Sequence, residues 1–255
     1  MSQADKARAF AAFHVKGNPL LLYNIWDAGS ARAIEKAGAA AVATGSWSVA
    51  AAQGFHDGEA LPLDLLVTVV ERIAATVDLP LSVDFEGGFA DAPEQLTQNT
   101  GRILAAGAIG VNFEDQIVRG DGLHETARQA ERIAAVRSAG DSAGVPLFIN
   151  ARTDLFLKEQ NRDRHGELVA EAIERAGIYA RAGASGFFVP GLIDPDLIAS
   201  VCQEISLPVN VMMMPDAPSI PALADLGVSR VSYGPAPYRE AVKAIADRFT
   251  AIRSG

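Results

Sequence analysis

The chain is poor in cysteine, in positive charge and in long apolar runs, and each shortage argues against a class of protein. Cys202 is the only cysteine among 255 residues, so no disulfide forms within the chain, as is typical of a reducing cytosol. Lysine and arginine number 22 against 31 acidic residues, and the net charge of −9 disfavours binding to nucleic acids or anionic membranes. No apolar run approaches the roughly 18 residues that cross a bilayer, and residues 1–17 lack the apolar centre of a signal peptide. We therefore expect a cytoplasmic protein.

Short apolar segments alternate with longer amphipathic ones along the whole chain. The apolar segments predict strands at 20–25, 40–44, 81–85, 110–113, 146–150, 187–189, 209–213 and 230–233. The amphipathic segments predict helices at 30–37, 63–76, 93–106, 125–139, 166–182, 195–204, 219–226 and 236–252. Eight strand–helix units favour a single (β/α)8 TIM barrel domain over residues 1–255. A doubly wound open sheet is the alternative, but no Gly-x-Gly-x-x-Gly follows the first strand.

An acidic motif ends the third predicted strand. Asp84 and Glu86 follow an apolar run and are separated by one residue. Because residues i and i+2 of a strand point the same way, we expect both carboxylates to face a common point. Two like charges so placed call for a cation, and the pair Glu114-Asp115 ends the next strand in the same manner. The motif predicts a metal site, with helix capping or a pair with Arg102 as the alternative.

Other polar residues also follow predicted strands, at the end where barrel enzymes bind their substrates. Arg152 is expected to clamp a substrate carboxylate through its planar fork, or else to pair with Asp154. The backbone N–H groups around Gly45 and Ser46 can bind an anion, although the segment is also compatible with a plain turn.

A long loop over residues 53–58 and two tryptophans complete the candidate site. Asp57 lies in this loop, which fits either a gate over the site or a simple Asp-Gly turn. Trp26 and Trp47 follow the first two strands and either wall the pocket or pack at its rim. Asn210 lies on the seventh predicted strand.

In this order, the segments resemble the isocitrate lyase/phosphoenolpyruvate mutase superfamily. The resemblance covers residues 18–238 and is carried by the segments 23–32, 44–46, 54–57, 84–89, 110–116, 150–154 and 208–212. It implies a barrel whose last helix is swapped between subunits of a homo-oligomer, usually a tetramer, with a dimer as the alternative. It also implies Mg2+, or Mn2+, and a small 2-oxo or hydroxy acid bound through its carboxylate.

The resemblance further implies a role for each matched residue. The implied metal residues are Asp84, Glu86 (where many members have aspartate) and Glu114. The implied catalytic residues are Asp57, Arg152 and Glu114. The implied substrate-binding residues are Trp26, Gly45, Ser46, Trp47, Asp84, Arg152 and Asn210.

The segment 116–124 departs from the better-known members. Lyases that cleave isocitrate or methylisocitrate carry Lys-Lys-Arg-Cys-Gly-His or a close variant there, and phosphonopyruvate-making mutases carry a lysine and an Asn-Ser pair. This chain has neither, and Pro190-Gly191 stands where the mutases place a histidine. The sequence therefore predicts a Mg2+-dependent carbon–carbon lyase or decarboxylase that acts on oxaloacetate or a substituted malate through an enolate. A phosphonopyruvate mutase or hydrolase, and a catalytically silent oxo-acid-binding protein, are the alternatives.

Overall fold

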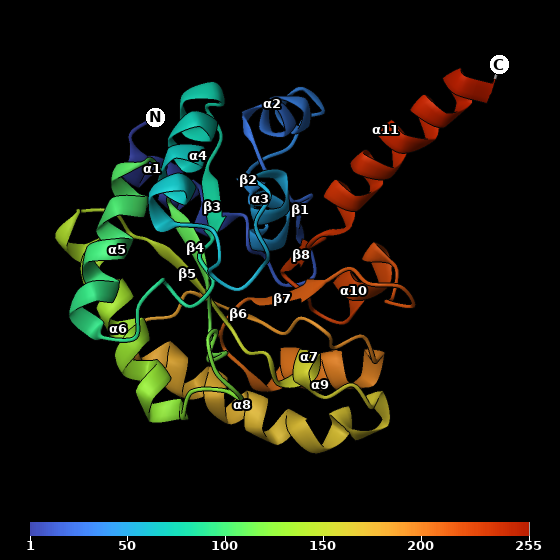
Figure 1. Ribbon diagram of the computed structural model, residues 1–255. Helices are drawn as coiled ribbons and strands as arrows, with labels where there is room; N and C mark the ends of the chain where they lie inside the picture. Colours follow the sequence, from blue (N-terminus) through green and yellow to red (C-terminus); the bar gives the residue numbers. More distant parts are fainter. Residues whose placement is uncertain (255) are drawn as a thin grey trace.

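Eight parallel strands form the centre of the computed structural model, which describes residues 1–254 (Figure 1). The strands are β1 (Leu20–Leu22), β2 (Val42–Ala43), β3 (Leu81–Asp84), β4 (Gly110–Glu114), β5 (Phe148–Arg152), β6 (Gly186–Phe188), β7 (Val209–Met212) and β8 (Arg230–Ser232). Hydrogen-bonded neighbours follow the order β1-β8-β7-β6-β5-β4-β3-β2. A parallel bridge between Ile25 and Thr44 links the two outer strands, where the Ile25 amide donates to the Ala43 carbonyl at 2.8 Å. The predicted (β/α)8 barrel is confirmed.

Helices follow the strands and surround the barrel. They are α1 (Gln3–Ala12), α2 (Ala28–Lys36), α3 (Ser46–Ala52), α4 (Leu63–Thr76), α5 (Pro93–Ala105), α6 (Thr126–Ser142), α7 (Leu155–Lys158), the 3-10 turn η1 (Arg162–Arg164), α8 (His165–Arg181), α9 (Pro195–Glu204), α10 (Ile220–Asp225) and α11 (Ala236–Ser254). All the helices predicted from periodicity are present. The sequence did not predict α1, α3, α7 or η1. Of these, α3 and α7 directly follow β2 and β5, so they shape the face where the strands end.

The interior of the barrel contains a polar layer as well as apolar side chains. Asn112 on β4 accepts hydrogen bonds at its Oδ1 from the Asn150 side chain (2.9 Å) and from Nη2 of Arg230 (3.1 Å). These donors come from β5 and β8, so the three side chains meet inside the ring. Neighbouring residues such as Val111 and Val231 are fully buried in the hydrophobic core, as the alternation of strand side chains requires.

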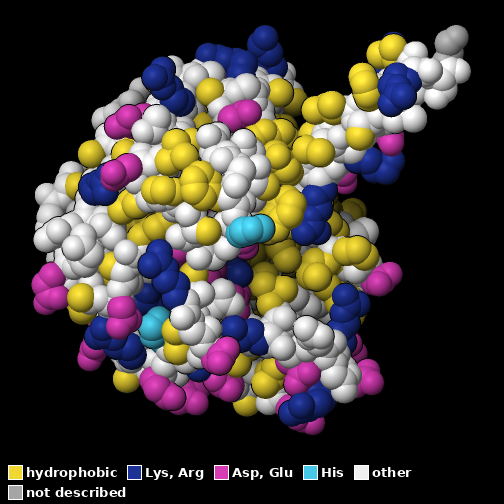
Figure 2. All heavy atoms as spheres, viewed as in Figure 1, with side chains coloured by type: hydrophobic (Ala, Val, Ile, Leu, Met, Phe, Trp, Pro, Cys, Tyr) yellow, Lys and Arg dark blue, Asp and Glu magenta, His cyan; other side chains and the backbone are white. Residues whose placement is uncertain are grey.

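Helix α11 differs from the others because it projects away from the barrel (Figure 1). Its exposed residues Val242, Ile245, Phe249 and Ile252 follow one another at intervals of three or four, which places them on one helical face. Figure 2 shows hydrophobic side chains along this helix and on the adjoining face of the barrel. Within residues 1–254, no helix combines the length and apolarity that a membrane crossing requires.

Candidate active site

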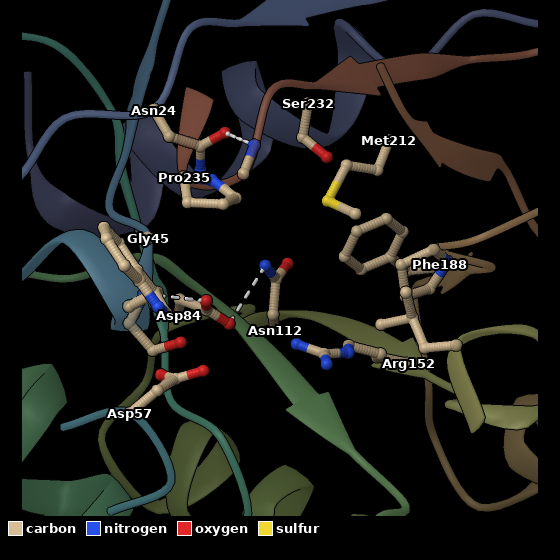
Figure 3. Close-up of a pocket in the computed structure, with 15 residues that line it drawn as sticks. Asn24, Gly45, Asp57, Asp84, Asn112, Arg152, Phe188, Met212, Ser232 and Pro235 are labelled. Carbon is tan, nitrogen blue, oxygen red and sulfur yellow. Dashed lines mark hydrogen bonds between the residues drawn. The ribbon is translucent and has the colours of Figure 1, made fainter. Parts of the chain in front are cut away.

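A cavity of about 200 Å3 lies at the carboxyl ends of the strands (Figure 3). This is the end of a TIM barrel at which active sites are found. The residues that line it are Asn24, Gly45, Ser46, Trp47, Asp57, Asp84, Asn112, Arg152, Leu157, Phe188, Pro190, Met212, Ser232, Gly234 and Pro235. The structure therefore brings together six of the residues singled out in the sequence, namely Gly45, Ser46, Trp47, Asp57, Asp84 and Arg152.

Asp84 ends β3 and is held in place by its neighbours on both sides. Its amide donates to the Thr44 hydroxyl at 2.9 Å, and its Oδ2 accepts the Ser46 amide at 2.9 Å. Its Oδ1 accepts from the Asn112 side chain at 3.3 Å. The turn predicted to bind an anion thus already directs one N–H to a protein carboxylate. Figure 3 shows the Asp84 side chain at the cavity wall, between Asn112 and the Gly45 segment.

Asp57 reaches the same side of the cavity from the loop after α3. Figure 3 shows its carboxylate beside that of Asp84. Burial raises the pKa of Asp57 above its ordinary value, and the charge of Asp84 raises it further, while a hydrogen bond with Ser46 opposes the change. The two carboxylates therefore lie close together in a partly buried site, where a proton or a cation would stabilise them.

Glu86 does not line the cavity, and its side chain turns away from the point that the spacing predicts. β3 ends at Asp84, and Glu86 has a φ of +50°, so the alternation of a strand no longer applies. Its Oε2 instead accepts the amide of Glu59 at 2.8 Å. Burial raises the pKa of Glu86 to about 8, and the charges of Asp57 and Asp84 contribute.

Glu114 lies at the end of β4, where it is buried against Arg152. Its Oε2 is 2.9 Å from Nη1 of Arg152. Burial raises the pKa of Glu114 well above its ordinary value, with Arg152 opposing and Asp154 adding to the rise. Within residues 1–254, no three His, Cys, Asp or Glu side chains form a group that could hold a metal ion together. The predicted convergence of Asp84, Glu86 and Glu114 on one point is therefore not seen, and their role as metal residues stays a prediction.

Arg152 makes the pair with Asp154 and also lines the cavity, and its role as a clamp for a substrate carboxylate stays a prediction. Its Nε and Nη2 donate to Asp154 at 2.6 and 3.0 Å, so the pair with Asp154 exists. The same side chain lines the cavity, with its guanidinium carbon 6.0 Å from the centre of the Phe188 ring. Burial acts to lower the pKa of Arg152, but Glu114 and Asp154 outweigh it and hold the pKa well above its ordinary value. Arg152 therefore stays charged.

Two predicted substrate residues lie elsewhere. Trp26 is not among the lining residues, and its ring contacts Tyr238 with centroids 5.1 Å apart. Asn210 is buried in the barrel and also outside the lining, with Ser232 Oγ 3.4 Å from its Oδ1. Their contribution to substrate binding stays a prediction. Trp47 does line the cavity, and the guanidinium of Arg239 lies 4.5 Å from its ring centre.

Asn24 and Asn112 also line the cavity, although the sequence predicted no role in the site for either of them. Asn24 accepts the amides of Tyr233 and Gly234 at 2.9 Å each and donates to the Thr44 carbonyl at 2.8 Å, so it joins the ends of β1, β2 and β8. Asn112 faces Asp84 across the pairing of β3 and β4. Its register relative to Asp84 was the signal that could have identified it, because paired residues of adjacent strands point the same way.

Known proteins resemble this chain in sequence over most of its length. Residues 10–253 match the family model described as phosphoenolpyruvate phosphomutase. An uncharacterized protein of Mycobacterium tuberculosis is 32% identical over 97% of this chain and 90% of its own length. The 2-methylisocitrate lyase of Escherichia coli is 29% identical over 82% of this chain and 70% of its own length.

A solved structure gives the same result. This is the crystal structure of a Burkholderia cenocepacia protein that is assigned as a phosphonomutase. It matches this chain with a TM-score of 0.95 at 45% sequence identity, and the match covers 100% of both chains. The family model spans almost the entire chain, including every strand and every residue of the cavity. The chain therefore belongs to the phosphoenolpyruvate phosphomutase family, within the isocitrate lyase/phosphoenolpyruvate mutase superfamily of lyases and mutases.

Proposed function

We propose that this protein is a Mg2+-dependent carbon–carbon lyase or decarboxylase that acts on a small 2-oxo or 2-hydroxy carboxylic acid of the oxaloacetate or substituted-malate type. The arrangement of Asp57 and Asp84 on one side of a small cavity, with the charged Arg152 also in its wall, is the observation that carries the proposal. An acid that binds a cation through one end and the guanidinium through the other fits this distribution of charge.

The residues present fit a magnesium ion. Mg2+ usually keeps several waters and binds through one or two carboxylates together with substrate oxygens, so it does not need three converging acids. Asp84 faces the cavity and is the carboxylate that we propose as its direct ligand, with Asp57, Glu86 and Glu114 acting through water. Burial is the main cause that raises the pKa values of these three surrounding acids, and the charge of Asp84 adds to each rise, so a cation bound here would stabilise their charged forms.

The protein groups have separate tasks in the proposed reaction. Bound Mg2+ would act as a Lewis acid that stabilises negative charge as the enolate forms. Arg152 binds a substrate carboxylate and is kept in position by Asp154 and Glu114. Asn112 and the Ser46 amide hold the Asp84 side chain in place. The carboxyl group of Asp57 exchanges a proton with the substrate through one of the Asp57 oxygens.

Pyruvate formation tests this proposal, because both decarboxylation of oxaloacetate and cleavage of a 2-methylmalate release it. We expect Mg2+-dependent pyruvate release that EDTA abolishes and that Asp84→Asn reduces strongly, measured with a coupled lactate dehydrogenase assay. Conversion of phosphonopyruvate, followed by phosphorus NMR, would instead indicate cleavage of a carbon–phosphorus bond. Tight binding of oxo acids without any product over hours would show a silent binding protein.

We also propose that α11 docks on the barrel of a neighbouring subunit, which gives a homo-oligomer with swapped helices. The apolar face of α11 is exposed, and a groove beside β1, lined by Leu20, Leu21 and Tyr23, stands open on the barrel. We expect a tetramer or dimer in sedimentation experiments, and dissociation on replacing Ile245 and Phe249 by aspartate. A wild-type monomer would contradict the proposal. The cytoplasmic location stays a prediction.

A further inference from the structure

Three residues with a strained backbone lie beside the cavity, on the loop that carries Asp57 and on the turn after β3. Among residues 1–254, four residues other than glycine have a positive φ, and three of them are Glu59 (+57°), Glu86 (+50°) and Phe89 (+57°). A side chain makes this left-handed backbone costly, so a fold keeps it only where other contacts fix it. Such strain gathers at functional sites, and here it begins two residues after Asp57.

Glu59 joins three segments of the chain through its own hydrogen bonds. Its amide donates to Oε2 of Glu86 at 2.8 Å, and its Oε1 accepts the amide of Phe89 at 2.7 Å. These two bonds run in opposite directions, so they attach the loop after α3 to the turn after β3 at two points. The carbonyl of Glu59 also accepts from Nη2 of Arg119 at 3.3 Å, which adds the segment 116–122. Glu59 is buried, so these bonds are shielded from water.

The packing around this junction leaves little room for the loop to shift. A Cβ at Gly87 would lie 3.0 Å from Oε1 of Glu59 and 2.9 Å from the Val118 side chain. A Cβ at Gly58 would lie 3.7 Å from the same valine, which is ordinary van der Waals contact. Val118 therefore packs over both the loop after α3 and the turn after β3.

Two glycines flank Asp57 and leave its loop with little stiffness of its own. Gly54 and Gly58 have φ values of +80° and +86°, and glycine restricts the backbone less than any other residue. Figure 3 shows the Asp57 carboxylate beside that of Asp84. This placement therefore depends on where the chain is fixed after Gly58, and Glu59 is the next residue.

We propose that Glu59 is a positioning residue, which places the Asp57 carboxylate beside Asp84 by attaching the loop to the turn after β3. The inference rests on the proposed function, in which Asp57 exchanges the proton. Loss of the Glu59 carboxylate frees the Phe89 amide and removes one of the two attachments. Asp84 and Arg152 are held by other residues, so substrate binding is retained while proton transfer slows.

Three substitutions of Glu59 separate positioning from stability. Glu59→Gln keeps an acceptor for the Phe89 amide, Glu59→Ala removes it, and Glu59→Gly removes both the acceptor and the strain of the left-handed backbone. Glu59→Gly should therefore melt at a higher temperature than Glu59→Ala. In the pyruvate assay, both should lower kcat about tenfold or more with little change in KM, because a small displacement of a reacting group costs at least this much. Glu59→Gln should recover most of kcat.

Two further variants test whether Glu59 acts through Asp57. In an Asp57→Asn background, Glu59→Ala should have almost no further effect on kcat, because the group that it positions is already lost. Glu35→Ala is the matched control. Glu35 also accepts a backbone amide, that of Asp78 at 3.1 Å, but it does not line the cavity, so its loss should leave kcat unchanged.

Hydrogen exchange of the backbone amides gives a readout that needs no turnover. The amides of Phe89 and of residues 55–59 should exchange faster in Glu59→Ala and Glu59→Gly than in the wild type and Glu59→Gln. Unchanged exchange there, full activity in Glu59→Gly, or an additive loss in the Asp57→Asn background would overturn the inference. A wild-type protein that releases no pyruvate would refute the proposed reaction, and the exchange rates would then decide whether Glu59 holds the loop.

Discussion

Arg152 offers the sharpest test of the site, because its structural and catalytic contributions can be separated. The perturbation is a pair of substitutions, Arg152→Lys and Arg152→Ala. Lysine keeps the charge but replaces a planar fork with a single ammonium group, so it cannot reproduce the two bonds to Asp154 at 2.6 and 3.0 Å together with the contact to Glu114 at 2.9 Å. Alanine removes the charge as well.

The magnitudes follow from these contacts. Hydrogen bonds to charged groups contribute about 1.5–3 kcal/mol each to stability. The lysine ammonium and a bound water would restore part of the bonding that the guanidinium makes to Asp154 and Glu114. Arg152→Lys should therefore lower the free energy of unfolding by about 2 kcal/mol. Arg152→Ala leaves Glu114 and Asp154 buried without their cation and should cost about 3–5 kcal/mol. Turnover should fall about a hundredfold or more in Arg152→Ala, as is found when a preorganised donor to the substrate is removed.

The assay combines urea unfolding with steady-state kinetics on the same preparations. Arg137→Lys is the control, because Arg137 is another half-buried arginine that donates to Gly183 and Ser185, away from the cavity. It should lose stability without losing turnover. Arg152→Lys should lose turnover beyond what its stability explains, and the loss should persist at saturating Mg2+. Full activity in the folded Arg152→Lys variant would refute the proposal that the planar guanidinium of Arg152 binds the substrate carboxylate.

Three further outcomes follow from the described contacts. Burial raises the pKa of Glu86 to about 8 from an ordinary 4.5, so the folded protein holds a proton that the unfolded chain releases, and without Mg2+ the free energy of unfolding should fall as pH rises through this range. Mg2+ binding should release protons, which calorimetry in two buffers measures. The Glu86→Gln variant should release fewer protons than the wild type. Arg230→Met should leave the free energy of unfolding unchanged or raised in urea titrations, because this fully buried guanidinium has two nitrogens without a partner among the described residues; a loss above about 2 kcal/mol would contradict this. Gly88→Ala should cost about 1–3 kcal/mol in the same titrations, since its Cβ would lie 2.5 Å from Leu96 and its φ is +80°, whereas Gly101→Ala, with open space, should not destabilise.

The periodicity of the sequence was sufficient to predict the barrel, but it did not predict the structure at the ends of the strands. The strand predicted over 20–25 stops at Leu22, and beyond it the side chain of Asn24, not a strand backbone, accepts the amides at the end of β8. α3 was not predicted, since its N-cap is Gly45 and no side chain caps it. α1 had a readable signal, a capping box in which Ser2 and Asp5 bind each other's backbone amides. Short helices without such signals depend on tertiary contacts that a local pattern does not contain.

The candidate site shows the same limit at the level of single side chains. Spacing alone located Asp84, and the alternation rule then assigned Glu86 to the same point, although the rule holds only while the chain remains a strand. The left-handed backbone at Glu86 directs its carboxylate to the amide of Glu59, in the loop that carries Asp57. A longer acid at this position therefore ties the Asp57 loop to the end of β3, and its charge reaches a metal at Asp84 only through water. This geometry is why Asp84→Asn should abolish metal binding, whereas Glu86→Gln should retain it with altered pH dependence.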